Sequence, residues 1–372
     1  MVFDGFSLMG FLTLLFFFLS FFYIGFGLLV IVGLCVREKK DSGYDKKVSI
    51  AVVAKDEEES LPALLERLSK LDELSAVHEF ILVDDNSEDR TGELMEAFAR
   101  KAGKTRVIRL KGKPPGLPGK KWGITRVMET AVTDFVFFTD ADCLPPLSWV
   151  KRGKSYLDEK TGMAIGAVFS SRRNWFAALE STSGALFAFA LAPFGQAPYC
   201  SGGNMIVSRK AFETVGGYDG TPSMASGDDM FLLQKIQKSF SIRPMYERAT
   251  AVLTHRLYSP GEYVEKNKRK YGKNFHLRSW QTAAFLAGIL YFSLIPVMVV
   301  GGRGACPLIW TVLGGKALTE WAAFGIGAVR MGRIKEIPFF PVFALLYPVK
   351  VIIFSFWGAL KGYRWKSERK IH

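Results

Sequence analysis

The chain has 372 residues, of which 49% are hydrophobic, and it carries a formal net charge of +14. This length allows one large or two modest domains, and so high an apolar fraction is unusual for a soluble protein. The charge suits nucleic acid or an anionic membrane surface, but the sequence has no nucleic-acid-binding signature, and its four scattered cysteines show no metal-clip or disulfide spacing. We therefore expect a membrane partner and no nucleic acid.

The first predicted element is a membrane anchor. Residues 6–34 contain no charged side chain, and this run exceeds the ~20 residues that a helix needs to cross a bilayer. A cleaved signal peptide would have a basic start and a shorter apolar run, so we interpret residues 1–36 as a retained anchor. The basic residues that follow place the next part of the chain in the cytoplasm: Arg37, Lys39, Lys40, Lys46 and Lys47. The predicted location is the inner (cytoplasmic) membrane, with several spans.

Residues 45–280 form the predicted cytoplasmic domain, in which strand-like and helix-like stretches alternate. Runs rich in β-branched or aromatic residues predict strands over 48–54, 79–85, 105–110 and 135–140. Helical spacing of apolar residues predicts helices over 59–71, 88–101 and 120–131. This alternation needs crossover connections and is typical of an α/β fold with a mostly parallel, Rossmann-like sheet.

Acidic residues follow three of these strands, in the pairs Asp56 and Glu57, Asp84 and Asp85, and Asp140 and Asp142. Ligands of parallel sheets bind outside the carboxyl ends of the strands. Carboxylates that gather there repel one another unless a cation compensates them, and Mg²⁺ or Mn²⁺ prefers such oxygen ligands. We expect Asp140 and Asp142 to continue their strand, so that both side chains point the same way and reach one ion. A turn or a helix cap is the alternative explanation of any single strand end.

Two later stretches add charged groups. The loop KGKPPGLPGKKWG places Lys120 and Lys121 at a predicted helix start, where phosphate groups are favoured, and a plain surface loop is the alternative for its first half. Asp228 and Asp229 precede an apolar helix, and adjacent carboxylates raise one another's pKa, which suits a general base. Helix capping is the alternative for this pair. Residues 174–200, which lie between, are almost uncharged and are either a buried core helix or an interfacial helix.

The C-terminal block, residues 281–360, is apolar again. Three segments are each long enough to span a membrane, near 282–300, 305–329 and 337–360. Lys316 and Glu320 lie four residues apart in the middle segment and can pair there. The tail, residues 361–372, is basic, and a cytoplasmic tail requires one segment to be interfacial or re-entrant. The last segment is the candidate because it contains three prolines.

In their order along the chain, these stretches resemble the family 2 glycosyltransferases, which have the GT-A fold. The matching motifs are AVVAKDEEESLPALLERL, FILVDDNSEDRTGEL, the Gly-Lys segment LPGKKWGI and the D-x-D of FTDADCLP. GGNMIVSRKAFETVGGYDG looks like the acceptor-side stretch of that family, and SGDDMFLLQKI looks like its acidic dyad. The resemblance covers roughly residues 48–275, and it is specific because all these motifs occur in the correct order.

The resemblance implies an inverting transfer of a sugar from a UDP- or GDP-sugar to a membrane-lipid hydroxyl or phosphate, similar to bacterial lipid and carotenoid glycosyltransferases. Asp229 would be the catalytic base with Asp228 beside it, and Asp140 and Asp142 would hold Mg²⁺ or Mn²⁺. The implied nucleotide-sugar contacts are Asp56, Glu57, Asp84, Asp85, Lys120, Lys121, Asp140, Lys270 and Tyr271.

One motif departs from the family pattern. Many membrane members carry Q-x-x-R-W after the base, whereas this sequence has NKRKY, with Asn267, Lys270 and Tyr271 at the matching positions. Lysine keeps the charge of arginine but not its bidentate fork, so a processive polysaccharide synthase fits the sequence less well. The same acidic motifs would also suit a nucleotide-sugar-binding protein without turnover, or a nucleotidyltransferase, which would release pyrophosphate.

Overall fold

The computed structural model describes residues 8–37, 43–112, 114, 117, 119–170, 174–222, 227–256, 258–272, 275, 279–304, 306–361, 363–365 and 368–370. The chain forms two compact units. The α/β unit comprises residues 36–257 and 330–333, and the helical unit comprises residues 1–35, 258–329 and 334–372. The α/β unit therefore includes a short second stretch from far along the chain.

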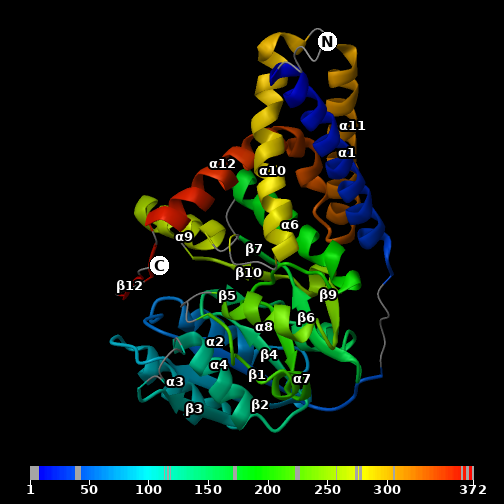
Figure 1. Ribbon diagram of the computed structural model, residues 1–372. Helices are drawn as coiled ribbons and strands as arrows, with labels where there is room; N and C mark the ends of the chain where they lie inside the picture. Colours follow the sequence, from blue (N-terminus) through cyan, green and yellow to red (C-terminus); the bar gives the residue numbers. More distant parts are fainter. Residues whose placement is uncertain are drawn as a thin grey trace, which may run out of the picture. The chain divides into compact units, whose positions relative to one another are not determined.

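A seven-stranded sheet forms the centre of the α/β unit (Figure 1). Its strand order is β3-β2-β1-β4-β8-β6-β9, in which β8 runs antiparallel to both of its neighbours and the other adjacent pairs are parallel. In that order the strands are Thr105–Arg109, Val77–Asp84, Val48–Ala54, Phe135–Thr139, Met205–Ser208, Thr161–Gly166 and Ser241–Met245. Strands β1, β2 and β4 are parallel neighbours, so their carboxyl ends meet at one edge, as the sequence predicts.

Helices make the crossovers between the parallel strands, and the predicted strands and helices of this region are confirmed with shifts only at their ends. The crossover helices are α2 (Leu61–Ser69), α3 (Thr91–Ala102) and α4 (Gly119–Thr130). The unit also contains α5 (Trp149–Lys154), α6 (Trp175–Leu191), α7 (Arg209–Thr214) and α8 (Asp228–Ile236). A second sheet of three short strands has the order β5-β10-β7, with bounds Cys143–Leu144, Val252–Thr254 and Val168–Ser170.

The apolar patterns of the sequence account for the core of this unit. Strand β1 is buried along nearly its whole length, as expected of a central parallel strand covered on both faces. Helix α2 buries one stripe at helical spacing, Leu61, Leu64, Leu65 and Leu68. Phe137 of β4 packs edge-to-face on Trp149 with ring centroids 5.2 Å apart, a contact worth ~1 kcal/mol beyond its buried area. This packing holds the end of β4 in a fixed position.

Residues 330–333 complete the α/β unit from the C-terminal half of the chain. The Arg330 guanidinium lies 3.7 Å from the centroid of the Tyr246 ring, and that of Arg333 lies 4.5 Å from the centroid of the Phe169 ring. Met331 between them is buried. This segment therefore contributes side chains to the core and is not a passing linker.

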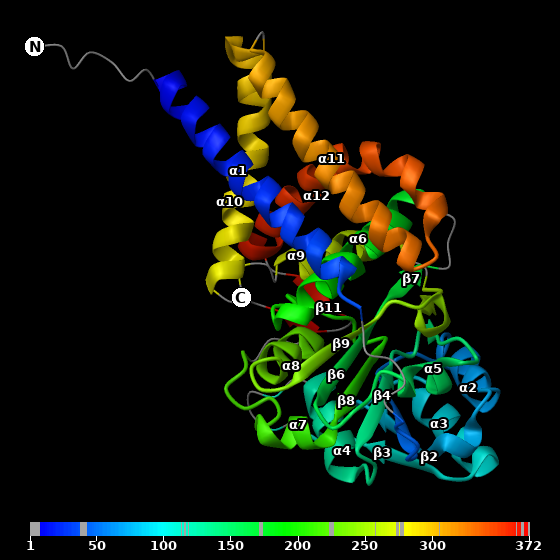
Figure 2. The same cartoon turned by 90° about the vertical axis from the view of Figure 1, so that its right-hand side faces the viewer.

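Three long helices run side by side in the helical unit (Figures 1 and 2). They are α1 (Leu8–Cys35), α10 (Ser279–Met298) and α11 (Pro307–Arg330). Met9 of α1 lies beside Gly301 just after α10, and Ser20 donates a hydrogen bond to Tyr291 over 3.4 Å, so α1 and α10 are antiparallel. Gly27 of α1 lies against Thr319 of α11, which runs parallel to α1.

The predicted pair on α11 is confirmed. Lys316 Nζ lies 2.8 Å from Glu320 Oε2, and the hydroxyl of Tyr23 donates to Oε1 of the same carboxylate over 2.5 Å. The Lys316 ammonium also faces the rings of Tyr23 and Phe292. The pair thus ties α1 to α11 inside the bundle.

Two more helices pack on each other in this unit, α9 (Pro260–Gly272) and α12 (Phe340–Lys361). A Cβ at Gly358 would collide with the backbone carbonyl of Lys268 and lie 3.1 Å from the Cα of Gly272, so only glycine permits this approach. The remaining elements are the π-helix Val299–Arg303, the 3₁₀ helix Ile334–Phe339, and strands β11 (Tyr363–Trp365) and β12 (Glu368–Lys370).

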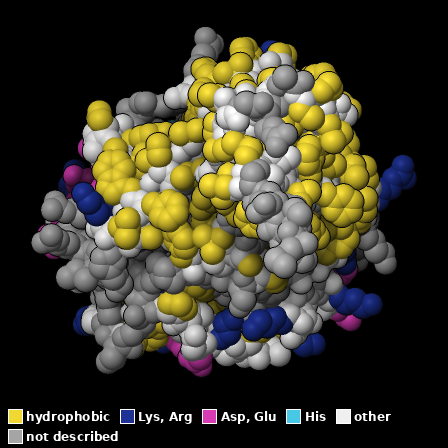
Figure 3. Space-filling view, turned by 45° about the horizontal axis from the view of Figure 1, so that its top comes forward, with side chains coloured by type: hydrophobic (Ala, Val, Ile, Leu, Met, Phe, Trp, Pro, Cys, Tyr) yellow, Lys and Arg dark blue, Asp and Glu magenta, His cyan; other side chains and the backbone are white. Residues whose placement is uncertain are grey.

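Among the residues described, four helices are long and apolar enough to cross a membrane, over 8–35, 175–194, 280–301 and 334–361. Two of the three C-terminal segments predicted to span are among them. The third forms α11, which has 24 residues but is not among the four, because its charged pair lowers its hydropathy. The segment 175–194 qualifies although 44% of its most apolar window is buried inside the structure. These helices make the chain membrane-associated, and Figure 3 shows a broad field of apolar side chains.

Candidate active site

The D-x-D motif lies in a turn that directly follows β4. The strand ends at Thr139, and the backbone N–H of Cys143 donates to the carbonyl of Asp140 over 3.0 Å, which closes the turn. The expectation that Asp140 and Asp142 continue an extended strand is therefore wrong, because the chain must reverse here to form β5. The turn still brings ligand atoms of Asp140, Asp142 and Cys143 within 4.8 Å of one another.

Asp142 is the most perturbed carboxyl of this turn. It accepts hydrogen bonds over 3.4 Å from the Cys143 thiol and from the Thr254 hydroxyl of β10. Burial, Asp140 and Glu57 raise the pKa of Asp142, and Arg256 partly opposes them. Arg256 lies 3.0 Å from Glu57 Oε1, so this ion pair stands beside the D-x-D turn.

Lys120 links the D-x-D turn to the acidic dyad. Its ammonium lies at the start of α4, 2.7 Å from Asp140 Oδ1 and 3.4 Å from Asp228 Oδ2. Burial alone would lower the pKa of Lys120, but Asp140, Asp228 and Asp229 outweigh it and hold that pKa above its ordinary value. Lys120 is therefore a fixed cation between Asp140 and Asp228, which lie 88 residues apart in sequence.

The acidic dyad opens α8. Gly227 takes a positive φ of 88° at the N-cap, and Asp228 and Asp229 occupy the first turn, where negative charge stabilises a helix. Asp229 Oδ2 accepts the backbone N–H of Gly202 over 3.1 Å, and Oδ1 accepts that of Met230 over 2.7 Å. Asp228 and Asp229 thus both stabilise the start of α8 and belong to the acidic cluster.

The glycine pair of the GGN motif approaches both acidic groups, which the motif alone did not reveal. A Cβ at Gly202 would lie 3.0 Å from Lys120 Nζ and 3.6 Å from Asp228 Oδ2. A Cβ at Gly203 would lie 2.8 Å from Cys143 Sγ and 3.3 Å from Asp140 Oδ2. Two residues without side chains therefore leave the centre of the cluster open.

The next residue, Asn204, anchors this glycine turn. Its side-chain amide donates to the carbonyls of Ala167 and Thr250 over 2.9 and 2.8 Å, and its oxygen accepts from Trp149 Nε1 over 3.0 Å. Asn204 has no solvent exposure, so losing these bonds would leave buried polar groups unsatisfied. The buried amide explains why the turn holds one geometry.

The carboxylates after β1 and β2 form a neighbouring group. Asp56, at φ 49°, accepts the N–H of Glu88 over 2.8 Å, and Asp84 accepts that of Ser87 over 2.9 Å. Asp85 is buried against Gly119, where an added Cβ would collide with its carboxylate. These bonds show that Asp56 and Asp84 also hold their own turns in place.

Three sequence candidates lie in other surroundings. Lys121 is buried on α4, donates to the carbonyl of Pro222 over 2.5 Å and lies 4.7 Å from the centroid of the Phe231 ring. Lys270 and Tyr271 lie on α9 of the helical unit, where Tyr271 contacts Tyr347. The structure thus groups Lys120 with the acidic cluster and gives Lys121 neutral and aromatic partners.

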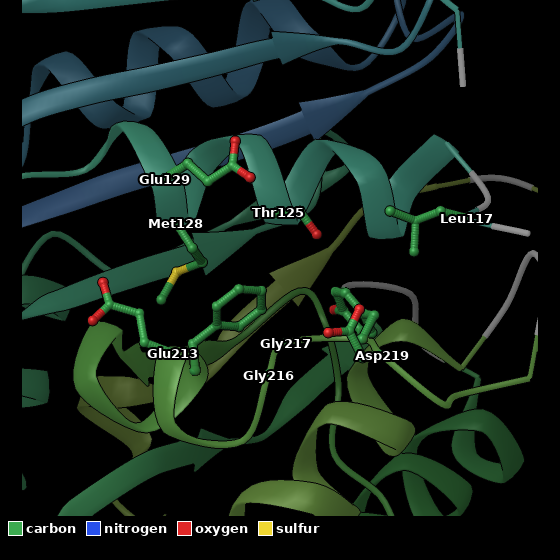
Figure 4. Close-up of a pocket in the computed structure, with 10 residues that line it drawn as sticks. Leu117, Thr125, Met128, Glu129, Glu213, Gly216, Gly217 and Asp219 are labelled. Atoms are coloured by element: carbon green, nitrogen blue, oxygen red, sulfur yellow. The ribbon is translucent and has the colours of Figure 1, made fainter. Parts of the chain in front are cut away.

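A cavity of about 320 Å³ lies elsewhere in the α/β unit, between α4 and the chain that follows α7 (Figure 4). It is lined by Leu117, Thr125, Met128, Phe212, Tyr218 and Asp219, among others. No acidic residue of the D-x-D turn or the dyad lines it. Its volume therefore does not mark the acidic cluster.

Comparison with known proteins shows which sequences and structures this chain resembles. Residues 49–216 match the sequence profile of glycosyl transferase family 2. A β-monoglucosyldiacylglycerol synthase of Synechocystis sp. is 27% identical over 183 residues, which are 46% of this chain and 37% of that protein. An undecaprenyl-phosphate 4-deoxy-4-formamido-L-arabinose transferase of Serratia proteamaculans is 32% identical over 133 residues, 35% of this chain and 40% of that protein. The chain thus spans about two-fifths of the length of these curated relatives.

A solved structure shares the fold. It is a mannosyltransferase from Pyrobaculum calidifontis in complex with GDP-Man and Mn²⁺, with a TM-score of 0.56 over 93% of this chain and 99% of that one. At 15% identity this likeness establishes the fold alone. The α/β unit therefore has the GT-A fold, and residues 49–216 within it are similar to glycosyl transferase family 2.

Proposed function

We propose that this protein transfers a sugar, with inversion, from a UDP- or GDP-sugar to a hydroxyl or phosphate of a membrane lipid. The observation that carries the proposal is the meeting of Asp140 and Asp228 at Lys120, beside Asp142 and Asp229. One cluster thus contains both a candidate cation site and a candidate base, which a transfer between two bound substrates requires.

The D-x-D turn fits a divalent cation. Asp140 and Asp142 supply carboxylate oxygens within 4.8 Å of each other, the ligand type that Mg²⁺ and Mn²⁺ prefer. Burial and the two aspartates raise the pKa of the Cys143 thiol, which favours oxygen over sulfur ligation here. When bound, such an ion would neutralise the donor diphosphate and so improve the leaving group.

Different residues of the site would then bind the donor nucleotide and balance the charge of its diphosphate. Asp56, Glu57, Asp84 and Asp85 are proposed for the donor nucleotide, because they lie at the ends of the adjacent parallel strands. Lys120 would balance charge among the acidic groups and the diphosphate. Of the other candidates, Lys121, Lys270 and Tyr271 remain proposals for donor contacts.

Asp229 is proposed as the base. The acceptor oxygen would attack the anomeric carbon, the bond from that carbon to the diphosphate would break, and the acceptor proton would pass to the Asp229 carboxylate. The N–H of Gly202, which donates to Oδ2 over 3.1 Å, would hold this carboxylate in place. The released product is then a nucleoside diphosphate.

A lipid acceptor follows from the membrane helices. The names of both relatives describe transferases of lipids, and the chain itself carries apolar helices in both units. We propose an anchor over residues 1–36, a cytoplasmic catalytic domain over 45–280, membrane or interfacial helices over 281–360 and a basic tail over 361–372 in the inner membrane. The basic residues after the anchor support this orientation.

The test uses the purified full-length protein with UDP- and GDP-sugars, Mg²⁺ or Mn²⁺ and extracted membrane lipids. We expect a glycolipid and a nucleoside diphosphate, and a fall of at least ~100-fold in Asp229→Asn with donor binding retained. Asp134→Asn, an exposed acid outside the cluster, is the matched control and should keep its rate. Full activity of Asp229→Asn would refute the base, release of pyrophosphate would indicate a nucleotidyltransferase, and donor binding without turnover would indicate a binding protein.

A further inference from the structure

The last apolar helix, α12, has the composition of a membrane span, but its contacts within the helical unit contradict a spanning position. Its segment, residues 334–361, is one of the candidate spans, less apolar than 8–35 and 280–301 and more apolar than 175–194. We infer that α12 instead lies along the membrane surface together with α9, and that, among the described helices of the helical unit, α1, α10 and α11 cross the bilayer.

The first observation is the partner of α12. Helix α9 packs along it and carries two acidic and four basic side chains in 13 residues, Glu262, Glu265, Lys266, Lys268, Arg269 and Lys270. Lys350, at the middle of α12, donates to the Tyr263 hydroxyl of α9 over 2.8 Å. If α12 spanned the bilayer, this contact would place α9 near the midplane.

That placement is unfavourable. Each charged side chain at the centre of a bilayer loses its hydration, so such residues are rare there and face a charged partner or a water-filled cavity. The charged side chains of α9 and Lys350 itself would all incur this cost. At the headgroup level the same side chains remain hydrated. The close contact of Gly358 with Lys268 and Gly272 keeps the two helices from separating.

The second observation is the depth of the two ends of α12. Phe340, its first residue, stacks on Phe324 of α11 with ring centroids 4.3 Å apart. Near its other end, Phe356 contacts Phe275, which also contacts Phe285 of α10. Phe324 lies six residues before the end of α11, and Phe285 lies six residues after the start of α10, so each is ~9 Å from that end of its helix.

Those two helix ends lie on the same side of the membrane. Helices α10 and α11 are consecutive and antiparallel, since α1 is antiparallel to the first and parallel to the second. Both ends of α12 are therefore at a similar depth, although its 22 residues extend for ~33 Å. The helix crosses the bundle obliquely and does not run parallel to α10 (Figure 1).

The third observation is the charge at both ends of α12. Lys335 precedes the helix, next to Glu336, and Lys361 begins the basic tail that follows it. A span would carry its basic flank on one side only, whereas a helix in the plane of an anionic leaflet is favoured by basic residues at both ends. The outward side chains Val342, Leu345, Val349, Ile353 and Leu360 are each more than half exposed, and we assign the acyl chains of this leaflet as their partner.

Depth measurement by spin labels tests this directly on the full-length protein in lipid nanodiscs with anionic lipid. Labels at Leu345→Cys and Leu360→Cys, 15 residues apart, should lie at the same depth within about 5 Å, whereas a span would separate them by ~22 Å. Leu286→Cys on α10 and Val300→Cys in the π-helix that continues it, both exposed, form the control pair and should differ by ~21 Å. Native cysteines are replaced in the background of every variant.

A second measurement locates the tail. A tag after residue 372 and a label at Lys335→Cys should be accessible from the same face of sealed vesicles. A depth difference of ~22 Å across α12, or a tail on the opposite face, would overturn the inference. Neither readout involves sugar transfer, so the result is independent of the proposed function.

Discussion

Removing the charge of Lys120 is the sharpest test of the site's electrostatics. Lys120→Met keeps the length of the side chain but leaves Asp140 and Asp228 without the ammonium that lies 2.7 and 3.4 Å from them. We expect the folded state to lose stability because these carboxylates then repel one another. The loss should depend on pH and on divalent cations, since either protons or a metal ion can relieve that repulsion.

The size of this stability loss follows from the distances between the Lys120 ammonium and the two carboxylates. With an effective dielectric constant of 20, unit charges at these separations attract by ~6 and ~5 kcal/mol, and desolvation offsets much of this gain. Removal of one partner of a buried pair costs ~3–5 kcal/mol. The Lys120 and Asp140 side chains are 23% and 35% exposed to solvent, which weakens their interaction. We therefore expect a smaller loss of stability, ~2–3 kcal/mol, or ~5–10 °C in melting temperature.

Thermal unfolding followed by tryptophan fluorescence, between pH 5 and 8 with and without Mn²⁺, measures the effect. The raised pKa of Lys120 means that its own contribution is complete below its ordinary pKa of 10.5 and is lost only as pH rises through the folded value, so it is constant over this range. Burial, Asp140 and Glu57 raise the pKa of Asp142, so protons reach this cluster at higher pH than an ordinary carboxyl. The deficit of the variant should thus be largest at pH 8 without metal and shrink at pH 5 or with Mn²⁺.

The adjacent lysine provides the control. Lys121→Met removes an ammonium that is more deeply buried than that of Lys120 and whose partners include the Pro222 carbonyl and the Phe231 ring. The loss of stability in Lys121→Met should be the same with and without Mn²⁺. A Lys120→Met deficit that is the same at pH 5 and pH 8 and unchanged by Mn²⁺ would refute the electrostatic reasoning.

Two further predictions concern stability and turnover. Gly202→Ala should leave the melting temperature nearly unchanged, since its Cβ meets only the flexible end of a lysine, but lower sugar transfer ~10-fold or more; Gly203→Ala should destabilise by ~1–3 kcal/mol because its Cβ meets the buried Cys143. Melting and turnover measured on the same preparations compare the two, and equal destabilisation would contradict this assignment. Burial alone would raise the pKa of Asp158, but the hydrogen bond from Thr161 and the charge of Arg243, 2.6 Å away, outweigh burial and lower this pKa. The stabilisation that Asp158 contributes is therefore present above pH 3.8 and is lost as pH falls through the lower folded pKa. Asp158→Asn should cost ~1 kcal/mol at pH 7 and flatten the acid-unfolding curve, and an unaltered curve would count against the pair.

The fold of the α/β unit could be predicted from the sequence because each element carries its own pattern. The run VSIAVVA forms β1 with the predicted bounds, because a short apolar segment rich in β-branched residues is typical of a parallel strand that is buried on both faces. The gathering of acidic residues at one edge follows from parallel strands. These features depend only on neighbours in sequence and on the chirality of crossovers.

The geometry of the site depends on residues distant in sequence, which no local pattern reports. The D-x-D forms a turn because Cys143 begins a strand that pairs with β10, more than a hundred residues later. Lys120 and Lys121 are identical in type and adjacent, yet one faces Asp140 and the other Pro222, because the rotation of α4 is set by tertiary packing. For α12, hydropathy indicates a span, whereas its prolines and the basic tail make it the candidate interfacial segment, and the contacts with α9 support the second interpretation.

The segment 330–333 has a consequence for biosynthesis. The rings of Tyr246 and Phe169 are covered by Arg330 and Arg333, which leave the ribosome only after α10 and α11. A chain cut after residue 257 would leave both rings uncovered and would lack the buried Met331. The α/β unit therefore completes its core only once α10 and α11, which precede this segment in the chain, have been synthesised.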